Sequence, residues 1–453
     1  MIKKILVANR GEIAVRVIRA CRDLGIDTVA IYSEADAQSL HVQLADMAVC
    51  VGPPPGRKSY LDMHNIIAAA LGASADAIHP GYGFLSENAQ FARLCETHNI
   101  IFIGPSPDTI EMAGDKVNAR QIVMAAGVPV VPGSPGKVSD VAEARKIANE
   151  IGYPILVKAK GGGGGKGMRV ILSEGDLLKS WSEAAGEASA AFGDDGLYIE
   201  RYMDQIRHVE VQVIADKSGN VIALGDRDCT VQRRHQKLIE EAPCPILSKA
   251  TREKIFIAAV QAAKAINYFS VGTVEFLYEP ATDNFYFIEV NSRIQVEHPV
   301  TEVLTNVDLV VEQIKIARGE SICIDGRDNG DRGHAIECRI NAEDASRDFF
   351  PSPGLISRYI VPGGPGIRVD GHCYQGYQFP PQYDSLLAKV IAYGPTREIA
   401  VERMIRALSE FVIEGIKTTI PFQLEVLEDE EFRSGIFTTR FLETRRKTSA
   451  DIA

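Results

Sequence analysis

The first hundred residues alternate between short apolar runs and amphipathic stripes, and this alternation constrains the fold more than any other feature of the sequence. Each apolar run is only as long as a strand. Strands separated by segments of helix length are typical of a parallel sheet with crossover helices. The expected elements are a helix whose apolar stripe runs from Ile13 to Leu24 and strands at residues 5–8, 28–32, 77–78 and 100–103.

The turn between the first strand and the first helix argues against one large class of parallel-sheet proteins. It reads Asn-Arg-Gly-Glu at residues 9–12. A dinucleotide-binding turn has the spacing G-x-G-x-x-G, whose glycines let the pyrophosphate approach the N-terminus of the helix. Because this turn lacks that spacing, a nicotinamide-dependent dehydrogenase is not expected.

Five consecutive glycines at residues 161–165, followed by Lys166 and Gly167, lie between two apolar runs of strand length. A flexible linker is one interpretation, but the position between two strands favours a hairpin. The tract is not a Walker P-loop, which needs Gly before the tract and Ser or Thr after its lysine, where this chain has Lys160 and Gly167. A glycine-rich hairpin can lay its backbone N–H groups against phosphates, and Lys158 would add a positive charge.

Two further expected strands, joined by a turn at residues 279–283, carry acidic side chains. The two-residue period of a strand places Phe287, Glu289 and Asn291 on one face. Any hairpin register that pairs odd positions with odd positions brings Glu275 to that face too. Two carboxylates and an amide oxygen are hard ligands of the kind that Mg²⁺ prefers. For these residues alone, an exposed polar face with unrelated acids is an equally good interpretation.

Polar and apolar residues alternate regularly in two other segments. His208 and Glu210 share the polar face of the first, and Glu337 and Arg339 share that of the second. Arg339 alone is more typical of a structural ion pair than of catalysis. Residues 232–237 carry four basic side chains in six positions, which fits either a solvated turn or an anion site.

Composition excludes several classes of protein. The 453 residues suffice for about three domains. The formal net charge of −11, from 49 Lys and Arg against 60 Asp and Glu, argues against nucleic acid as the main partner. Eight scattered cysteines without a C-x-x-C pair favour reduced thiols in a cytoplasmic protein over a zinc site. No signal peptide or membrane-spanning stretch is expected, and the polar residues 440–453 are expected to fray.

Taken together, these stretches closely resemble one family, the biotin carboxylases of the ATP-grasp superfamily. The resemblance extends over nearly the whole chain, to about residue 440, and the segments keep the order and spacing of the family. The matching segments are residues 5–14 (ILVANRGEIA), 79–88 (HPGYGFLSEN), 161–169 (GGGGGKGMR), 227–242 (RDCTVQRRHQKLIEEA), 287–302 (FIEVNSRIQVEHPVTE) and 333–343 (GHAIECRINAE). Departures at Lys160, Ser292 and Thr419 touch no proposed catalytic role.

The resemblance implies an α/β and α+β fold in three parts. An N-terminal Rossmann-like domain with a parallel sheet is expected at residues 1–113 and an ATP-grasp domain at residues 114–325. A mixed α+β C-terminal domain would follow at residues 326–445, with a tail at residues 446–453. A mobile glycine-rich lid is expected at about residues 131–203 within the ATP-grasp domain.

The resemblance also implies a set of functional residues. Glu275, Glu289 and Asn291 match the family's ligands for Mg²⁺ or Mn²⁺. Biotin is expected beside Tyr82 and Arg339. The expected bicarbonate-binding residues are Lys237, Arg293, Gln295, Val296, Glu297 and Arg339. The expected ATP-binding residues are Lys116, Lys158, Gly164, Gly165, Glu200, Arg201, Tyr202, Met203, His208, Gln232, His235, Glu275 and Glu289.

In the implied reaction, Glu297 deprotonates bicarbonate, whose oxygen attacks the γ-phosphate of ATP to give carboxyphosphate. Carboxyphosphate breaks down to CO₂ and phosphate, and the phosphate takes the proton from the ureido nitrogen of biotin. Arg339 then stabilises the enolate-like oxygen, and Lys237 and Arg293 complete the catalytic set. Bicarbonate is a weak nucleophile, so positioning and cations at the developing charge would do the catalytic work.

Biotin is expected on a second polypeptide, because the sequence contains no Met-Lys-Met attachment motif. The resemblance then implies a cytoplasmic homodimer that works with a biotin carboxyl carrier protein and carboxyltransferase subunits. Acetyl-CoA carboxylase, in fatty acid synthesis, is the first candidate for the complete enzyme. A two-subunit pyruvate carboxylase or another acyl-CoA carboxylase is the alternative, and no nucleic acid or membrane partner is expected.

Two other functions compete with this one. An ATP-grasp ligase that joins a carboxylate to an amine would share the lid and the acids, but it has no reason to carry Arg339 together with residues 293–297. A non-catalytic nucleotide-sensing or scaffold subunit would have lost catalytic positions. The match to the family retains all of them, which favours the enzyme.

Overall fold

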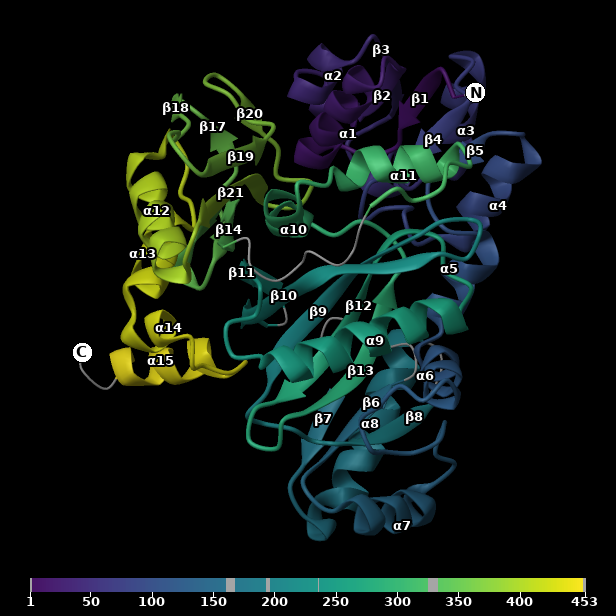
Figure 1. The fold of residues 1–453 in the computed structure, drawn as a ribbon, viewed down its shortest axis with the longest axis vertical. Coiled ribbons are helices and arrows are strands. Elements are labelled where there is room, and N and C mark those ends of the chain that lie inside the picture. The colour runs from purple at the N-terminus through teal and green to yellow at the C-terminus, as the bar shows by residue number, and fades with distance from the viewer. Residues whose placement is uncertain (1, 160–167, 193–195, 235, 325–332, 451–453) are drawn as a thin grey trace.

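The computed structural model describes residues 2–159, 168–192, 196–234, 236–324 and 333–450. The N-terminal region lies at the top of Figure 1 in purple, and the helices of the C-terminal region lie at the left in yellow. All eight cysteines are free thiols, and six of them are buried. No helix in the described ranges is long and apolar enough to cross a membrane.

The N-terminal sheet is parallel, as predicted, with the strand order β3-β2-β1-β4-β5. The predicted apolar stripe of the first helix is buried at Ile13, Val17 and Cys21. The strands are β1 (Lys4–Val7), β2 (Asp27–Ser33), β3 (Met47–Gly52), β4 (Ala77–His79) and β5 (Ile101–Phe102). The helices are α1 (Gly11–Asp23), α2 (Leu40–Leu44), α3 (Met63–Gly72), α4 (Ala89–Thr97) and α5 (Pro107–Gly114), with short 3-10 turns η1 (Glu34–Asp36) and η2 (Gly56–Lys58).

A small antiparallel sheet lies at the bottom of Figure 1, within the residues where a lid stays a prediction. Its strands follow the order β7-β6-β8 and share an apolar core with two helices, α7 and α8. Asp140 caps the first of these helices by accepting hydrogen bonds from two backbone N–H groups. The elements are α6 (Lys116–Ala125), α7 (Val141–Ile151), β6 (Ile155–Ala159), β7 (Met168–Ile171), α8 (Glu174–Phe192) and β8 (Leu197–Arg201).

An antiparallel sheet of eight strands forms the centre of the molecule, in the order β13-β12-β9-β10-β11-β14-β21-β19. This sheet contains strands from both sides of residue 325. The domain boundary predicted at that residue stays a prediction. Its strands are β9 (Arg207–Ala215), β10 (Val221–Arg233), β11 (Gln236–Ala242), β12 (Ser270–Glu279), β13 (Asn284–Asn291), β14 (His334–Asn341), β19 (Ile367–Gly371) and β21 (Leu386–Gly394). Three helices pack beside it: α9 (Lys249–Ala265), α10 (His298–Thr305) and α11 (Leu309–Ala317).

The two faces of this sheet differ as the alternating sequence predicted. Val209 and Val211 lie in the apolar core shared with α9, whereas Glu210 lies on the polar face. In β14, Cys338 packs into a second core, and Arg339 lies on the polar face. Both polar faces are largely buried, so their charges need partners within the protein.

The C-terminal region packs helices against one end of the central sheet. The expectation that residues 440–453 fray is wrong for most of that segment, because a helix begins at Phe441 and is anchored by the buried side chains of Phe441 and Leu442. The helices are α12 (Arg397–Glu410), α13 (Ile420–Glu428), α14 (Glu430–Ser434) and α15 (Phe441–Ala450), with the 3-10 turn η4 (Ala345–Arg347). The short strands are β15 (Glu343–Asp344), β16 (Phe350–Pro351), β17 (Gly354–Leu355), β18 (Arg358–Ile360), β20 (Gln378–Phe379) and β22 (Val412–Glu414).

Candidate active site

One cavity of about 1150 Å³ is lined by the N-terminal region, the small sheet, the central sheet and residues 382–386. Every predicted site residue that the structure describes lines this cavity. Gly164, Gly165 and His235 lie outside the described residues. The structure therefore brings the predicted residues together, while their assignment to ATP, metal, bicarbonate and biotin stays a prediction.

Lys237, on β11, points into the cavity between three carboxylates. Its Nζ lies 2.6 Å from Glu210, 3.0 Å from Glu275 and 2.7 Å from Glu297. Burial opposes the charge of this lysine, but the surrounding anionic groups raise its pKa well above the usual range. Lys237 is therefore a fixed positive charge at the centre of the cavity.

Glu297 is buried and receives a second cation from β14. Nη2 of Arg339 lies 2.8 Å from Glu297, and Nε of the same guanidinium lies 2.6 Å from Glu240. Burial alone would raise the pKa of Glu297, but Lys237 and Arg339 hold it well below its usual value. For Glu240 burial outweighs the effect of Arg339 and raises the pKa to about 7.

The part of the β12–β13 hairpin that carries the acids pairs odd positions with odd positions, which is the condition under which the sequence brought Glu275 to the face of Glu289. Glu275 pairs directly with Glu289, and Thr273 pairs with Asn291. The amide of Asn291 donates to Oε1 of Glu275 over 2.9 Å. These three polar side chains therefore form one group at the cavity wall.

One part of the hairpin prediction is wrong. Phe287 does not share a face with Glu289, because the register shifts after Glu275 and Phe287 pairs with Phe276. Both phenylalanines lie in the apolar core, with ring centroids 6.4 Å apart. A bulge adds one residue to one strand and so turns the next side chain to the other face. Here it separates the acids from the aromatic core.

The acids of this hairpin fit a magnesium ion by their chemistry. Glu275 and Glu289 offer carboxylate oxygens, and Asn291 offers an amide oxygen, all of them hard donors. Each already faces positive or N–H donor groups: Nζ of Lys116 lies 2.7 Å from Glu289, and Arg293 donates to Oδ1 of Asn291 over 3.1 Å. A divalent cation would find the negative charge that it needs at this position.

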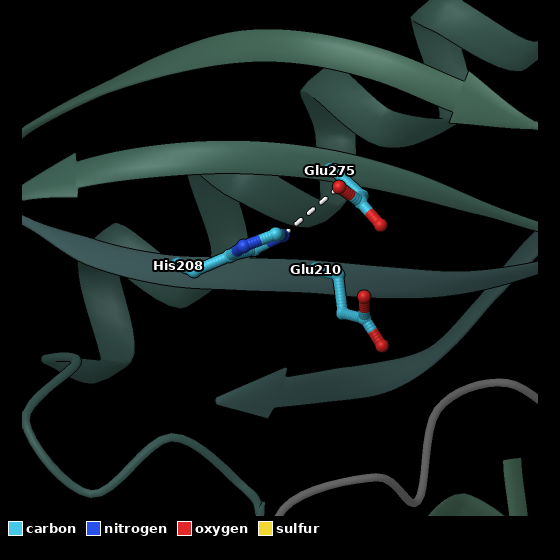
Figure 2. Close-up of side chains that lie close together, drawn as sticks. All are labelled: His208, Glu210 and Glu275. Carbon is cyan, nitrogen blue, oxygen red and sulfur yellow. Dashed lines mark ion pairs between the residues drawn. The ribbon is translucent and has the colours of Figure 1, made fainter. Parts of the chain in front are cut away.

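Figure 2 shows a second group that is close enough to hold a metal, with His208 and Glu210 on β9 and Glu275 on the neighbouring β12. Nε2 of His208 lies 2.9 Å from Glu275. Both oxygens of Glu210 are engaged, one by Arg227 at 2.5 Å and the other by Lys237. The hairpin acids are therefore the better candidates for the metal.

The predicted nucleotide-binding residues come from several elements. Lys158 on β6 forms an ion pair with Glu200 on β8, so this phosphate candidate is held by the small sheet. Arg201 donates to the hydroxyl of Tyr286 over 3.1 Å and so joins the small sheet to the central hairpin. Gln232 contacts Nδ1 of His208 over 2.7 Å. Tyr202 and Met203 continue the cavity wall after β8.

Residues 293–297 follow β13 and cross the cavity as a loop, which we call the 293–297 loop. Arg293 lies 2.9 Å from Glu87 of the N-terminal region. Gln295 donates to Oε1 of Glu275 over 2.9 Å and accepts from Arg227 over 2.8 Å. The loop is thus fixed to the central sheet by Glu275 and by Arg227, of which the sequence alone singled out only Glu275.

The basic run at residues 232–237 divides between the two interpretations that its sequence left open. Arg233 and Arg234 each lie 2.9 Å from Asp348, outside the carboxylate cluster. Lys237 lies inside that cluster. One end of the run thus forms an ion pair with Asp348, and the other end lies among buried carboxylates, where an anion site stays a prediction.

Two arrangements were not predicted from the sequence. Arg227 is fully buried and contacts Glu210, Thr273 and Gln295, among others, through its guanidinium. Glu240 and Glu241 are not free charges beside the basic run, since Glu240 holds Arg339 and Glu241 holds His334 and Arg397. The alternation of residues in β9 and β11 was the sequence signal that Glu210 and Glu240 lie on polar strand faces. It could not identify their partners, because those depend on which strands become neighbours in the sheet.

Tyr82, predicted to contact biotin, also lines the cavity and donates its hydroxyl proton to Glu12 on α1. It reaches the cavity from residues 79–88 of the N-terminal region, whereas Arg339 reaches it from the central sheet. A ligand between these two side chains would contact two regions of the molecule at once.

Comparison with known proteins agrees with this arrangement. Residues 1–110 match the family described as biotin carboxylase, N-terminal domain, and residues 337–444 match biotin carboxylase C-terminal domain. Residues 115–324 match the ATP binding domain of the carbamoyl-phosphate synthase L chain.

Individual proteins match over nearly their whole length. Biotin carboxylase 1 of Bacillus subtilis is 58% identical over 98% of this chain and 99% of its own. One of the subunits of pyruvate carboxylase from Methanothermobacter thermautotrophicus is 52% identical over 99% of this chain and 91% of its own. The biotin carboxylase domain dimer of Hydrogenobacter thermophilus 2-oxoglutarate carboxylase, solved with MgADP, ADP and bicarbonate, gives a TM-score of 0.92 at 52% identity, covering 98% of each chain. The chain belongs to the biotin carboxylase family.

Proposed function

We propose that this chain carboxylates biotin with bicarbonate at the expense of ATP, and that the biotin is presented by a separate carrier protein. The observation that supports this most strongly is the cluster in which Lys237 and Arg339 share Glu297. It lies in the same cavity as the phosphate-binding candidates Lys116 and Lys158. An ATP-grasp ligase acting on an amine would not need this combination.

In this reaction Lys237, Arg293 and Arg339 bind bicarbonate, and Glu297 removes its proton. A bicarbonate oxygen then forms a bond to the γ-phosphorus while the bond to ADP breaks, which gives carboxyphosphate. Carboxyphosphate yields CO₂ and phosphate, the phosphate takes the ureido proton of biotin, and the nitrogen attacks CO₂. Arg339 holds the negative oxygen of the ureido group during that attack.

The two cations beside Glu297 explain how a carboxylate with a depressed pKa acts as a base. Lys237 and Arg339 donate to Glu297, and both are also predicted partners of bicarbonate. A bound anion competes with Glu297 for those N–H donors. Glu297 therefore becomes more basic when bicarbonate is in place.

Magnesium would be held by Glu275, Glu289 and Asn291. When bound there, it would neutralise charge on the phosphates of ATP. Lys116, which lies beside Glu289, would then turn to a phosphate oxygen. The chain's own contribution at this wall is to orient the phosphates in line with the bicarbonate oxygen.

The basic test is ATP hydrolysis by the purified protein. We expect hydrolysis to depend on bicarbonate and to be faster with free biotin, and hydrolysis that ignores bicarbonate would contradict the proposal. Glu297→Gln should lower this hydrolysis by roughly 10³-fold, because it removes the base, while the Kd for ADP stays unchanged. Glu312→Gln is the matched control, since Glu312 pairs only with Lys315 among the contacts described on its helix; it should retain wild-type turnover.

We further propose that the acyl acceptor of the complete enzyme is acetyl-CoA, in fatty acid synthesis, with pyruvate as the second candidate. The match of 58% to a biotin carboxylase of similar length supports the first, and the match of 52% to a component of pyruvate carboxylase supports the second. Biotinylated carrier proteins of both systems should be compared as substrates by kcat/KM. A preference for the pyruvate carboxylase carrier would overturn the first candidate.

We also propose that the protein works as a cytoplasmic homodimer together with carboxyltransferase subunits. The dimeric biotin carboxylase domain of the Hydrogenobacter enzyme supports the dimer. Sedimentation of the purified protein should give twice the mass of one chain at micromolar concentration. A single-chain mass at all concentrations would contradict this part of the proposal.

A further inference from the structure

A lysine that the proposed mechanism does not use lies completely buried behind the 293–297 loop. Lys389 is in the middle of β21, directly opposite Arg339 on β14 and Asp370 on β19. Its side chain is 0% exposed. A buried ammonium is costly unless hydrogen-bonded and paired, so the partners of Lys389 show what holds it there.

Those partners come from two other regions of the molecule. Nζ of Lys389 donates to the carbonyl oxygen of Val296 over 2.8 Å and lies 3.2 Å from Oε1 of Glu12 on α1. Glu12 is also buried and accepts the hydroxyl proton of Tyr82. The contacts form one chain from Val296 through Lys389 and Glu12 to Tyr82.

The contact to Val296 fixes the direction of a peptide group in the 293–297 loop. The preceding carbonyl, that of Gln295, contacts Nδ1 of His298 over 2.7 Å. In a planar trans peptide the C=O and the following N–H point in opposite directions. The carbonyls of Gln295 and Val296 are both held away from the cavity. The N–H groups of Val296 and Glu297, which belong to the same two peptides, therefore point toward the cavity. Preorganised N–H donors are effective anion ligands because they need no rearrangement.

We propose that Lys389 is a positioning residue that orients the 293–297 loop for bicarbonate, and that Glu12 couples this loop to Tyr82 in the predicted biotin site. The inference rests on the proposed function. It adds a residue outside the predicted bicarbonate set and a physical link between the two substrate positions. A lysine that only neutralised Glu12 would affect stability and leave the affinity for bicarbonate unchanged.

The first experiment measures bicarbonate-dependent ATP hydrolysis in the absence of biotin. If the wild-type protein lacks this activity, the proposed function fails before any variant is made. With the activity present, Lys389→Met should raise the KM for bicarbonate roughly tenfold, as expected for loss of a hydrogen bond from a charged donor, and leave the KM for ATP unchanged. An unchanged KM for bicarbonate, or an equal rise in both constants, would overturn the proposal.

Arg397→Met is the matched control for removing a buried cation from the same region. Arg397 pairs with Glu241 over 2.6 Å and has no contact with the 293–297 loop among those described. Both variants should lose stability, but only Lys389→Met should change the KM for bicarbonate. If Lys389→Met does not fold, Glu12→Gln combined with Lys389→Met removes both charges, and a folded double variant with wild-type KM for bicarbonate would equally overturn the proposal.

Tyr82→Phe tests the coupling to the biotin site, because it deletes only the hydroxyl that Glu12 accepts. In the absence of biotin it should raise the KM for bicarbonate about twofold to fourfold, because Glu12 passes only part of the free energy of that hydrogen bond on to the loop. In Lys389→Met the same substitution should have no further effect on that constant. An unchanged KM for bicarbonate in Tyr82→Phe would refute the link through Glu12, whatever the other variants show.

Discussion

Arg234 and Lys237 lie three positions apart in one basic run and end in opposite surroundings. The side chain of Arg234 is 71% exposed and pairs with Asp348 at the surface, whereas that of Lys237 is 13% exposed and pairs with three carboxylates. An exposed ion pair contributes about 0–1 kcal/mol, because water and salt screen it. Removing one partner of a buried ion pair costs about 3–5 kcal/mol. The comparison teaches that burial, and not the density of positive charge in the sequence, separates the two cations, and it makes Lys237 the candidate for a functional role.

The sharpest test of this comparison is Lys237→Met. It should lower bicarbonate-dependent ATP hydrolysis by roughly 10³-fold, because it removes the proposed anion ligand and leaves three carboxylates to repel one another. The free energy of unfolding should fall by about 3–5 kcal/mol. Urea unfolding and steady-state kinetics measure the two effects. Turnover within tenfold of wild type would show that the buried cation is dispensable.

Acid should destabilise the protein through other buried groups. Burial lowers the pKa of His41 to about 4 and those of His79 and His372 to about 3. As the pH falls, these histidines take up protons in the unfolded chain before they do so in the folded protein. The free energy of unfolding is therefore at its full value above about pH 6.5 and declines as the pH falls toward 4. Each histidine contributes about 1.4 kcal/mol per pH unit, or about 4 kcal/mol for the three.

Urea unfolding at pH 7.5, 6.0 and 5.0 measures this decline. His79→Gln should reduce the slope of stability against pH by about one bound proton. A slope in His79→Gln equal to that of the wild type would contradict the burial argument.

Arg339→Ala should separate the two halves of the proposed reaction. Carboxylation of free biotin should fall by roughly 10²-fold, since the guanidinium no longer stabilises the ureido oxygen. Bicarbonate-dependent ATP hydrolysis should fall less, because Lys237 still contacts Glu297. Parallel assays of ADP and carboxybiotin check this, and equal losses would count against the assigned role of Arg339.

Arg234→Ala should have the smallest effect of the series. Loss of its surface pair with Asp348 should change the free energy of unfolding by less than about 0.5 kcal/mol and leave KM and kcat as in the wild type. High salt should make the variant and the wild type indistinguishable in urea unfolding. A large loss of activity would show that the exposed end of the basic run has a function of its own.

Local patterns predicted much of the site. The alternation in β9 and β14 follows from the two-residue period of a strand, which is a property of the backbone itself. The same period made it possible for Glu275 and Glu289 to share a face, but the register that pairs them is known only from the structure. The parallel N-terminal sheet followed from the spacing of apolar runs. The alternation and the parallel sheet need only information that is local in the sequence.

The features that were missed depend on contacts between distant segments. The bulge places Phe287 in the core against Phe276. The alternation of residues in β13 does not predict this bulge. Arg227 meets Gln295 only because β10 and the 293–297 loop come together. The helix at Phe441 forms on a hydrophobic core supplied by other elements, so its polar sequence alone suggested fraying.

The continuous central sheet has a consequence for motion. Glu275, Lys237 and Arg339 lie on β12, β11 and β14, which belong to one hydrogen-bonded array even though they come from two stretches of the chain. A slow twisting of that array carries all three side chains along together. We therefore expect their mutual spacing to change little when the sheet flexes.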